Sequence, residues 1–211
     1  MKVLSLWEGI KLLKKYRIPF VLSEITKKGK DLEKIAKKIG FPMILKISSR
    51  KIIHKTEAKA IRRANSLLEL KKEFNDLYNL AKRIDKNFDG IVVQKMLRGV
   101  ELIVGTKKDE QFGHTLLFGM GGIYTEIFKD FSLRVIPLTR KDVKEMIEET
   151  KAYKILSGFR GKKYDIKAIE NFVFRISKFV EKNKNIIELD INPLFALEKN
   201  CFAADVRIVV K

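Results

Sequence analysis

The sequence predicts an α+β fold, in which helices and strands are mixed along the chain. Several segments carry apolar residues at helical spacing, and some of them begin at capping residues. Other segments are short apolar runs bounded by glycine, proline or a turn, which is typical of strands. The two kinds do not alternate as in a doubly wound sheet, and no repeat or low-complexity linker interrupts them.

The first half of the chain can be divided by its capping and turn residues. Residues 5–16 repeat apolar side chains at helical spacing, and Asp31 can cap a second helix. Ser66 and Glu69 have the spacing of a capping box, which predicts a third helix. The helices expected here are residues 5–16, 32–39 and 66–84, and the strands are residues 41–47, 91–96 and 101–106.

The second half contains two further capped helices and an acidic end. Thr139 and Asp142 predict a helix that runs to about residue 150, and Asp165 begins another that runs to about residue 182. A strand is expected at residues 116–119. The chain ends in a hairpin that carries several acidic residues.

The acidic hairpin gathers hard oxygen ligands. Alternate side chains of an extended strand share a face, so we expect Glu188, Asp190 and Asn192 to project together. A turn at residues 198–200 can fold the run that carries Asp205 back beside them. Magnesium prefers one or two protein oxygens together with water and substrate phosphates. The acidic hairpin therefore predicts a nucleotide-phosphate site.

Two other features could contact phosphate. The glycine cluster of residues 118–126 can offer successive N–H groups as an anion nest, although a plain turn explains Gly121-Gly122 equally well. It fits neither the P-loop nor the dinucleotide-binding pattern. Lys46, near a strand end, is either a phosphate ligand or a surface lysine.

Composition limits the classes of function. The net charge is +19, but lysines are spread over nearly every segment, which indicates a solvated surface rather than nucleic-acid binding. No apolar stretch is long enough to span a bilayer, and the first residues lack a signal-peptide core, so we expect a cytoplasmic protein without membrane contact. The single cysteine, Cys201, is expected to be a buried small hydrophobe without a chemical role.

Taken together, these segments resemble a known family. Their order is that of the beta subunit of ADP-forming acetyl-CoA (acyl-CoA) synthetase, an ATP-grasp module related to the nucleotide-binding subunit of succinyl-CoA synthetase. The resemblance covers almost the whole chain. The segments that carry it are residues 12–19, Lys46, and residues 52–57, 93–96, 99–105, 111–113, 118–123, 134–139 and 189–194.

The resemblance implies an α+β ATP-grasp fold over residues 1–211, with the nucleotide between two α+β lobes. The lobes would be residues 20–90 and 91–211, with helix 5–16 packing on the larger one. Backbone groups of the strand at residues 92–97 would read adenine. The implied nucleotide-binding residues are Lys46, Lys55, Gln94, Met96, Glu101, Gly121, Gly122, Glu126 and Arg134, and the implied Mg²⁺ ligands are Asn192 and Asp205, with Asp190 nearby.

His54 would be the catalytic residue. In the family that His54 resembles, the matching histidine accepts phosphoryl from a phosphohistidine on a partner subunit and passes it to ADP. Imidazole suits this role because it is nucleophilic and partly neutral at physiological pH. Without the resemblance, a histidine beside lysines is more often an ordinary surface residue. The other histidine, His114, falls on no motif.

Two departures from the family pattern leave turnover open. Lys59-Ala60 stands where a Gly-Gly pair is usual, and Lys95 stands where an acid is usual. Side chains at residues 59 and 60 could block a phosphate, or Lys59 could supply charge. Lys95 would remove a carboxylate contact to ribose, whereas adenine reading through the backbone should survive.

The resemblance also implies a partner. The expected assembly is a heterooligomer, α2β2, with a separate CoA-binding alpha subunit, and the overall reaction is acyl-CoA plus ADP plus phosphate giving acid, CoA and ATP. Its acyl substrate and its preference for adenine or guanine stay open. The alternatives are a degenerate ATP-grasp module with a regulatory or scaffolding role, supported by the missing Gly-Gly pair, and a nucleic-acid-binding protein, supported by the charge.

Overall fold

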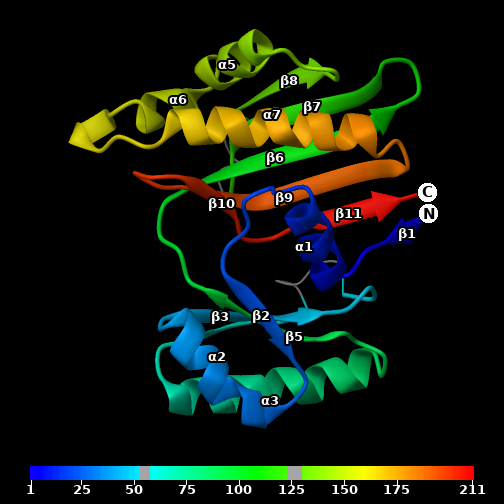
Figure 1. The fold of residues 1–211 in the computed structure, drawn as a ribbon, viewed down its shortest axis with the longest axis vertical. Helices are drawn as coiled ribbons and strands as arrows, with labels where there is room; N and C mark the ends of the chain where they lie inside the picture. The colour runs from blue at the N-terminus through cyan, green and yellow to red at the C-terminus, as the bar shows by residue number, and fades with distance from the viewer. Residues whose placement is uncertain (53–57, 123–129) are drawn as a thin grey trace. The chain divides into compact units, whose positions relative to one another are not determined.

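The structure is a computed structural model that describes residues 1–52, 58–122 and 130–211 (Figure 1). Contacts along the chain divide it into two compact units. The large unit comprises residues 1–3, 12–20 and 98–211, and the small unit comprises residues 4–11 and 21–97.

The units differ in their bounds from the lobes expected from sequence. The chain passes from the small to the large unit after Leu97 rather than after Gly90, because the strand between these residues pairs within the small sheet. Helix α1 (Leu6–Lys15) is divided between the units after Lys11. The division of the chain into lobes around a nucleotide stays a prediction.

The small unit is a four-stranded antiparallel sheet with two helices on one face (Figure 1). The helices are α2 (Leu32–Ile39), which follows the 3₁₀ turn η1 (Gly29–Asp31), and α3 (Leu67–Ile84). In spatial order, the strands are β2 (Ser23–Thr26), β5 (Gly90–Lys95), β3 (Met43–Ser48) and β4 (Ile61–Ala64).

Strand alternation divides the side chains of the small sheet between its two faces. Leu45 on β3 and Ile91 on β5 are fully buried in one apolar cluster that also contains Phe74 of α3. Because successive residues of a strand point to opposite faces, Lys46 and Gln94 project from the face away from the helices.

The helices begin where the capping residues predicted, but the Asp31 side chain makes no capping hydrogen bond and instead accepts one from Thr26. The Ser66 hydroxyl accepts a hydrogen bond from the N–H of Glu69 at 3.2 Å, but the Glu69 carboxylate accepts from the N–H of Asn65 rather than of Ser66, so only half of that box forms. The box of Thr139 and Asp142 is complete. Three of the four hydrogen bonds expected from the two boxes are therefore present.

The large unit is built on a seven-stranded sheet (Figure 1). Strand β10 (Cys201–Ala203) pairs with β9, beside the main path. In order along that path, the strands are β1 (Lys2–Val3), β11 (Arg207–Val210), β9 (Ile186–Ala196), β6 (Val100–Asp109), β7 (Gly113–Met120) and β8 (Phe131–Val135).

Helices pack against β7 and its neighbours on one face of this sheet. They are α5 (Arg140–Glu148), α6 (Lys151–Leu156) and α7 (Ile166–Lys182), with the 3₁₀ turn η2 (Phe159–Gly161) between the last two. Leu102, Val104 and Phe118 are fully buried toward these helices. We call the opposite face, to which Glu101, Ile103 and Leu117 point, the second face of the large sheet.

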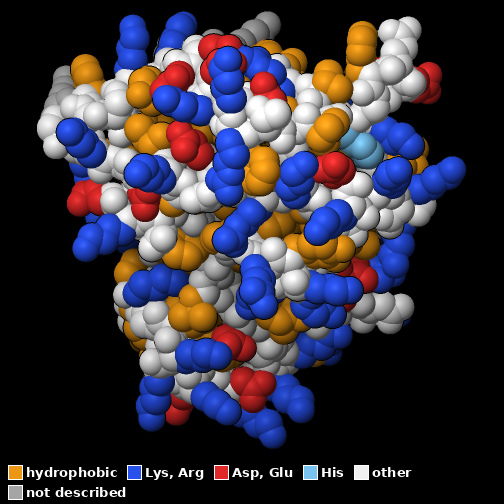
Figure 2. Space-filling model, turned by 45° about the horizontal axis from the view of Figure 1, so that its top comes forward, with side chains coloured by type: hydrophobic (Ala, Val, Ile, Leu, Met, Phe, Trp, Pro, Cys, Tyr) orange, Lys and Arg blue, Asp and Glu red, His pale blue; other side chains and the backbone are white. Residues whose placement is uncertain are grey.

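The helix expected to reach residue 150 ends at Glu148, and α6 starts at Lys151. Strands β1, β2, β4 and β8 were not predicted. On the face seen in Figure 2, Lys and Arg side chains are scattered and mixed with acids rather than gathered in one area. Within the described residues, no helix is long and apolar enough to cross a membrane.

Candidate metal and nucleotide site

A break in the β6–β9 ladder places Asn192. Leu102 pairs with Leu194 and Val104 pairs with Ile191, so β9 carries one residue more than β6 at Asn192-Pro193. This is a β-bulge, and such an extra residue re-aims the side chains beside it. The Asn192 side-chain oxygen accepts a hydrogen bond from the N–H of Gly122 at 3.2 Å. Asn192 thus turns toward the glycine pair.

Asp205 lies opposite Asn192 in the neighbouring segment. On one side of the two residues, the N–H of Ala204 donates to the carbonyl of Pro193 at 3.0 Å, and on the other side Arg207 pairs with Asp190. Both pairs belong to the same antiparallel register, so Asp205 and Asn192 face each other. Directly opposed residues of such a pair have Cα atoms roughly 4.5–5.5 Å apart. The adjacency expected from the sequence is therefore present.

The glycine pair packs tightly against β6. The N–H of Gly121 donates to the carbonyl of Glu101 at 2.8 Å. A Cβ on Gly121 would lie 2.7 Å from the backbone of Leu102, and a Cβ on Gly122 would lie 2.5 Å from the Glu101 carboxylate. Gly122 also has a φ of +63°, which favours glycine. Gly121 therefore has no room for a side chain, whereas a side chain at Gly122 would require the Glu101 carboxylate to move.

The result is a group of hard oxygen ligands, Glu101, Asn192 and Asp205, which we call the oxygen cluster. Carboxylate and amide oxygens suit Mg²⁺, which completes its shell with water and phosphate oxygens. The described residues contain no group of three or more His, Cys, Asp or Glu side chains that could hold a metal ion by themselves. The cluster fits a metal bound together with a phosphate better than a closed protein cage.

An ion pair next to the cluster was missed by the sequence analysis. Arg207 donates to the Glu188 carboxylate at 3.0 Å, and its buried Nε has no hydrogen-bond partner in the described structure. Glu188 is thus engaged by a cation rather than left to a metal. Because Arg207 is two residues from Asp205 on an extended segment, strand alternation could have predicted this cation near the acids.

Lys46 and Gln94 share one face of the small sheet. Lys46 pairs with Val92, and Ile44 pairs with Gln94, so the two polar side chains are neighbours on adjacent strands. Both are buried, at 6% and 2% exposure. The Gln94 side-chain nitrogen has no hydrogen-bond partner in the described structure, and an unsatisfied buried donor is costly. This observation favours a ligand at Gln94.

Backbone groups at the end of β5 are partly used within the small unit. The N–H of Met96 donates to the carbonyl of Pro42 at 3.1 Å, and the N–H of Lys95 donates to that of Leu22 at 3.0 Å. These two N–H donors are therefore occupied. A role for Met96 in reading adenine stays a prediction, and it would have to use another backbone group of the same segment.

The two departures from the family pattern have structural roles. The Lys95 ammonium lies 3.4 Å and 3.3 Å from the carbonyls of Gly40 and Phe41, at the C-terminal end of α2, where a cation stabilises the helix. Lys59 has a φ of +50°, the conformation in which glycine is preferred, and Ala60 is fully buried in the core. Ala60 therefore does not project toward a phosphate.

Other predicted residues are not brought to the cluster or lie outside the described residues. Arg134 forms an ion pair with Glu149 and donates to Ser132 at 3.0 Å, on the helix-covered face of the large sheet. The structure therefore does not bring it to the oxygen cluster. Three predicted residues lie outside the described residues: His54, Lys55 and Glu126.

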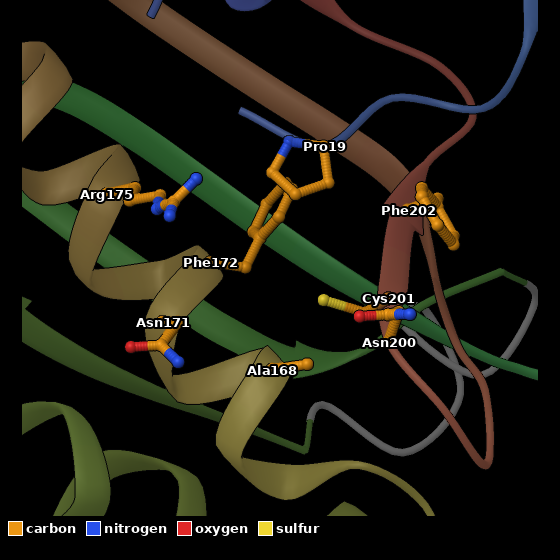
Figure 3. A pocket seen from close by; sticks show the side chains of 8 residues that line it. All are labelled: Pro19, Ala168, Asn171, Phe172, Arg175, Asn200, Cys201 and Phe202. Carbon is orange, nitrogen blue, oxygen red and sulfur yellow. The ribbon is translucent and has the colours of Figure 1, made fainter. Parts of the chain in front are cut away.

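A cavity in the large unit is separate from the predicted site residues (Figure 3). Its volume is about 190 Å³, and Phe172 of α7 points toward Pro19 across it. Cys201 also lines it, and burial raises the pKa of this thiol to about 12. The cysteine therefore stays protonated and unreactive at physiological pH, in keeping with the expectation of no chemical role.

The family follows from comparison with known proteins. A family described as an ATP-grasp domain matches residues 1–210. The acetate–CoA ligase (ADP-forming) II subunit beta of Pyrococcus furiosus is 39% identical over 213 residues, which cover 97% of this chain and 90% of that protein. The chain belongs to the ATP-grasp family of ADP-forming acetate–CoA ligase beta subunits. The predicted fold and family are confirmed.

Two further relatives are similar to this chain over nearly its whole length. Acetate–CoA ligase (ADP-forming) II of Archaeoglobus fulgidus is 38% identical over 205 residues, which cover 96% of this chain but 30% of that protein. A structure of acetyl-coenzyme A synthetase 1 of Ca. Korarchaeum cryptofilum matches with a TM-score of 0.85 and 34% identity, and covers 100% of this chain and 93% of that one. It contains coenzyme A and Mg-AMPPCP, with a phosphohistidine segment pointing towards the nucleotide binding site.

Membership of a beta-subunit family implies that this ATP-grasp protein works with another subunit. The family is one of ligases, so the chain is part of an enzyme.

Proposed function

We propose that this ATP-grasp protein is the nucleotide half of an ADP-forming acyl-CoA ligase. In this reaction His54 accepts phosphoryl from a phosphohistidine of a separate, CoA-binding alpha subunit and passes it to ADP. The overall reaction is reversible: acyl-CoA, ADP and phosphate give acid, CoA and ATP. The proposed assembly is an α2β2 heterooligomer in the cytoplasm.

The observation that carries this proposal is the oxygen cluster. Asn192 and Asp205 face each other at a β-bulge, and Gly122 is held against both Asn192 and Glu101. Asn192 and Asp205 would hold Mg²⁺, which would offset the negative charge of the phosphate groups. The glycine pair carries no side chain that would block a phosphate beside the cluster, and its two N–H groups donate to Glu101 and Asn192.

The small unit supports the same function from its own sheet. A buried lysine on β3 can neutralise phosphate charge, and the unsatisfied amide nitrogen of Gln94 can donate to a nucleotide. Both side chains project from the face without helices. Lys46 and Gln94 are thus proposed as nucleotide ligands, with Lys55, Met96 and Glu126 as further candidates.

The test is a pair of histidine variants, assayed with MgADP and the phosphorylated alpha subunit. His54→Ala should abolish ATP formation but keep the rise in melting temperature that MgADP gives, since a ligand selective for the folded state stabilises it. His114→Ala is the matched control, because His114 is the other histidine of the chain. Its ring nitrogen Nε2 forms a hydrogen bond with the carbonyl of Ile186 at 2.7 Å.

Unchanged ATP formation in His54→Ala would reject the phosphoryl shuttle. A melting temperature that does not respond to MgADP in the wild type would instead favour the alternative of a degenerate ATP-grasp module with a regulatory or scaffolding role.

A further inference from the structure

Three apolar side chains stand exposed in a row on strand β8. Phe131, Leu133 and Val135 are 44%, 51% and 47% exposed, whereas the alternate residues Ser132 and Arg134 contact Glu149 of the following segment. Within the described chain, β8 pairs only with β7, so its outer edge has no strand beside it. An apolar row on an edge strand is a surface that favours contact with another polypeptide. We call these three residues the β8 row.

The β8 row lies on the same face of the large sheet as the oxygen cluster. Phe131 pairs with Gly119, and Gly119 pairs with Ile103. Ile103 lies on β6 between the two residues whose β9 partners flank the bulge at Asn192. Since adjacent strands are about 4.8 Å apart, the three steps from β8 to β9 place Phe131 roughly 14 Å from Asn192 along one line across the sheet.

The row continues inward as an apolar surface. Leu133 pairs with Leu117 of β7, which is partly buried, and Ile103 of β6 is also partly buried and on the same face. The next strand, β9, carries Asp190 and Asn192 on this face. A polypeptide seated on the β8 row would therefore cross an apolar surface before it reaches the carboxylates of the oxygen cluster.

We infer that the β8 row docks an extended segment of the partner subunit and guides it over the second face to the oxygen cluster. This inference rests on the proposed function, because that function requires a phosphoryl-carrying segment to arrive from another subunit. It adds the surface of this chain along which the segment arrives. The open edge of β8 can also pair with such a segment as an added strand.

The size of the row and the architecture of the relatives favour this occupant over a second copy of the chain. Three half-exposed side chains offer on the order of a few hundred Å², well below the roughly 1,200–2,000 Å² of a stable protein interface. That area suits one segment of a partner whose other contacts lie elsewhere. In the Archaeoglobus relative the matching region is 30% of the protein, so the rest of that protein is long enough to supply such a segment.

The experiment compares Leu133→Asp with Leu68→Asp in the complex with the alpha subunit. Leu68 is an 81% exposed leucine of the small unit, so it controls for a new surface charge. Leu133→Asp should keep the MgADP-dependent rise in melting temperature but raise the concentration of phosphorylated alpha subunit needed for half-maximal ATP formation by about tenfold or more. Leu133→Asn, which adds no charge, should give a smaller change in the same direction. The control should match the wild type.

Several results would overturn the inference. If Leu133→Asp and Leu133→Asn both transfer phosphoryl at the wild-type partner concentration, the row is not the docking surface. Loss of the MgADP response in Leu133→Asp would assign the row to nucleotide binding. Loss of a concentration-dependent dimer of the chain alone, with partner dependence unchanged, would assign it to self-association.

Failure of the proposed function gives a different pattern. If the wild-type chain makes no ATP, the docking surface can still be tested, because sedimentation measures the association of the two subunits directly. Weakened association of Leu133→Asp, with wild-type association of Leu68→Asp, would then still support the docking surface. Equal association of both variants would overturn it.

Discussion

The two sheets hold their candidate ligands in different ways. In the small sheet, Lys46 and Gln94 lie on strands with an uninterrupted register, and simple alternation decides which face they use. In the large sheet, Asn192 lies where the register breaks, and Asp205 lies opposite it. A regular ladder can present a phosphate-binding cation or amide, whereas a cluster of oxygens around one metal needs a local departure from the ladder to converge.

The largest expected effect comes from the oxygen cluster. Asp205→Ala removes a carboxylate opposite Asn192, so ATP formation with the alpha subunit should fall by roughly 100-fold or more, the scale seen when one charge-stabilising group is lost. The MgADP-dependent rise in melting temperature should shrink as well. Both can be measured against Glu198→Ala, which removes an exposed acid of the nearby turn.

If Asp205→Ala forms ATP at the wild-type rate, the oxygen cluster takes no part in phosphoryl transfer. The difference between the two sheets would then have no bearing on function. A loss that is equal in Glu198→Ala would attribute the effect to general charge rather than to the cluster.

A smaller effect is expected at the glycine pair that supports the cluster. Gly122→Ala places a Cβ 2.5 Å from the Glu101 carboxylate at a φ of +63°, whereas Gly113→Ala has a φ of +79° with no atom within 4 Å of the new Cβ. Both substitutions carry a backbone penalty of roughly 1–2 kcal/mol. Only Gly122→Ala must also displace Glu101, so its free energy of unfolding in urea should fall further than that of Gly113→Ala.

The double variant Glu101→Ala, Gly122→Ala tests the cause of that excess. Removal of the carboxylate should recover the extra loss of stability in Gly122→Ala. Equal stability of the two single glycine variants would contradict a close contact at the bulge.

The regular parts of the fold followed from the sequence because they depend on local chemistry. Helix starts at Ser66 and Thr139 were found from capping spacing, and strands β3, β5 and β6 from apolar runs. The adjacency of Asn192 and Asp205 was also predicted, because a turn between two strands fixes which residues can meet. Their role as metal ligands stays a prediction.

The missed parts depend on contacts between distant segments. Strand β8 alternates exposed apolar residues with Ser132 and Arg134, so its sequence shows no apolar face to bury. The polar face is covered only because Glu149, which follows α5, contacts Ser132 and Arg134. The bulge at Asn192 is set by the pairing of β9 with β6, some ninety residues earlier. Neither could be derived from the local sequence. The ion pair of Arg207 and Glu188 was within reach, since both residues lie on predicted strands.

The smallest expected effect separates binding from stability in the small sheet. Gln94→Met replaces a buried amide, whose nitrogen has no partner, by an apolar side chain of similar length. Removing an unsatisfied donor should raise the free energy of unfolding by about 1 kcal/mol when no nucleotide is present. The same change should reduce the MgADP-dependent rise in melting temperature, because the donor proposed for the nucleotide is gone.

Gln111→Met is the matched control, since residue 111 is the other glutamine and lies exposed in the turn between β6 and β7. It should change neither quantity. If Gln94→Met loses stability without nucleotide, the amide is satisfied in the folded chain and the reason to assign it to a ligand disappears. If it gains stability and keeps the full MgADP response, the nucleotide does not use this donor, and the small sheet contributes through Lys46 without Gln94.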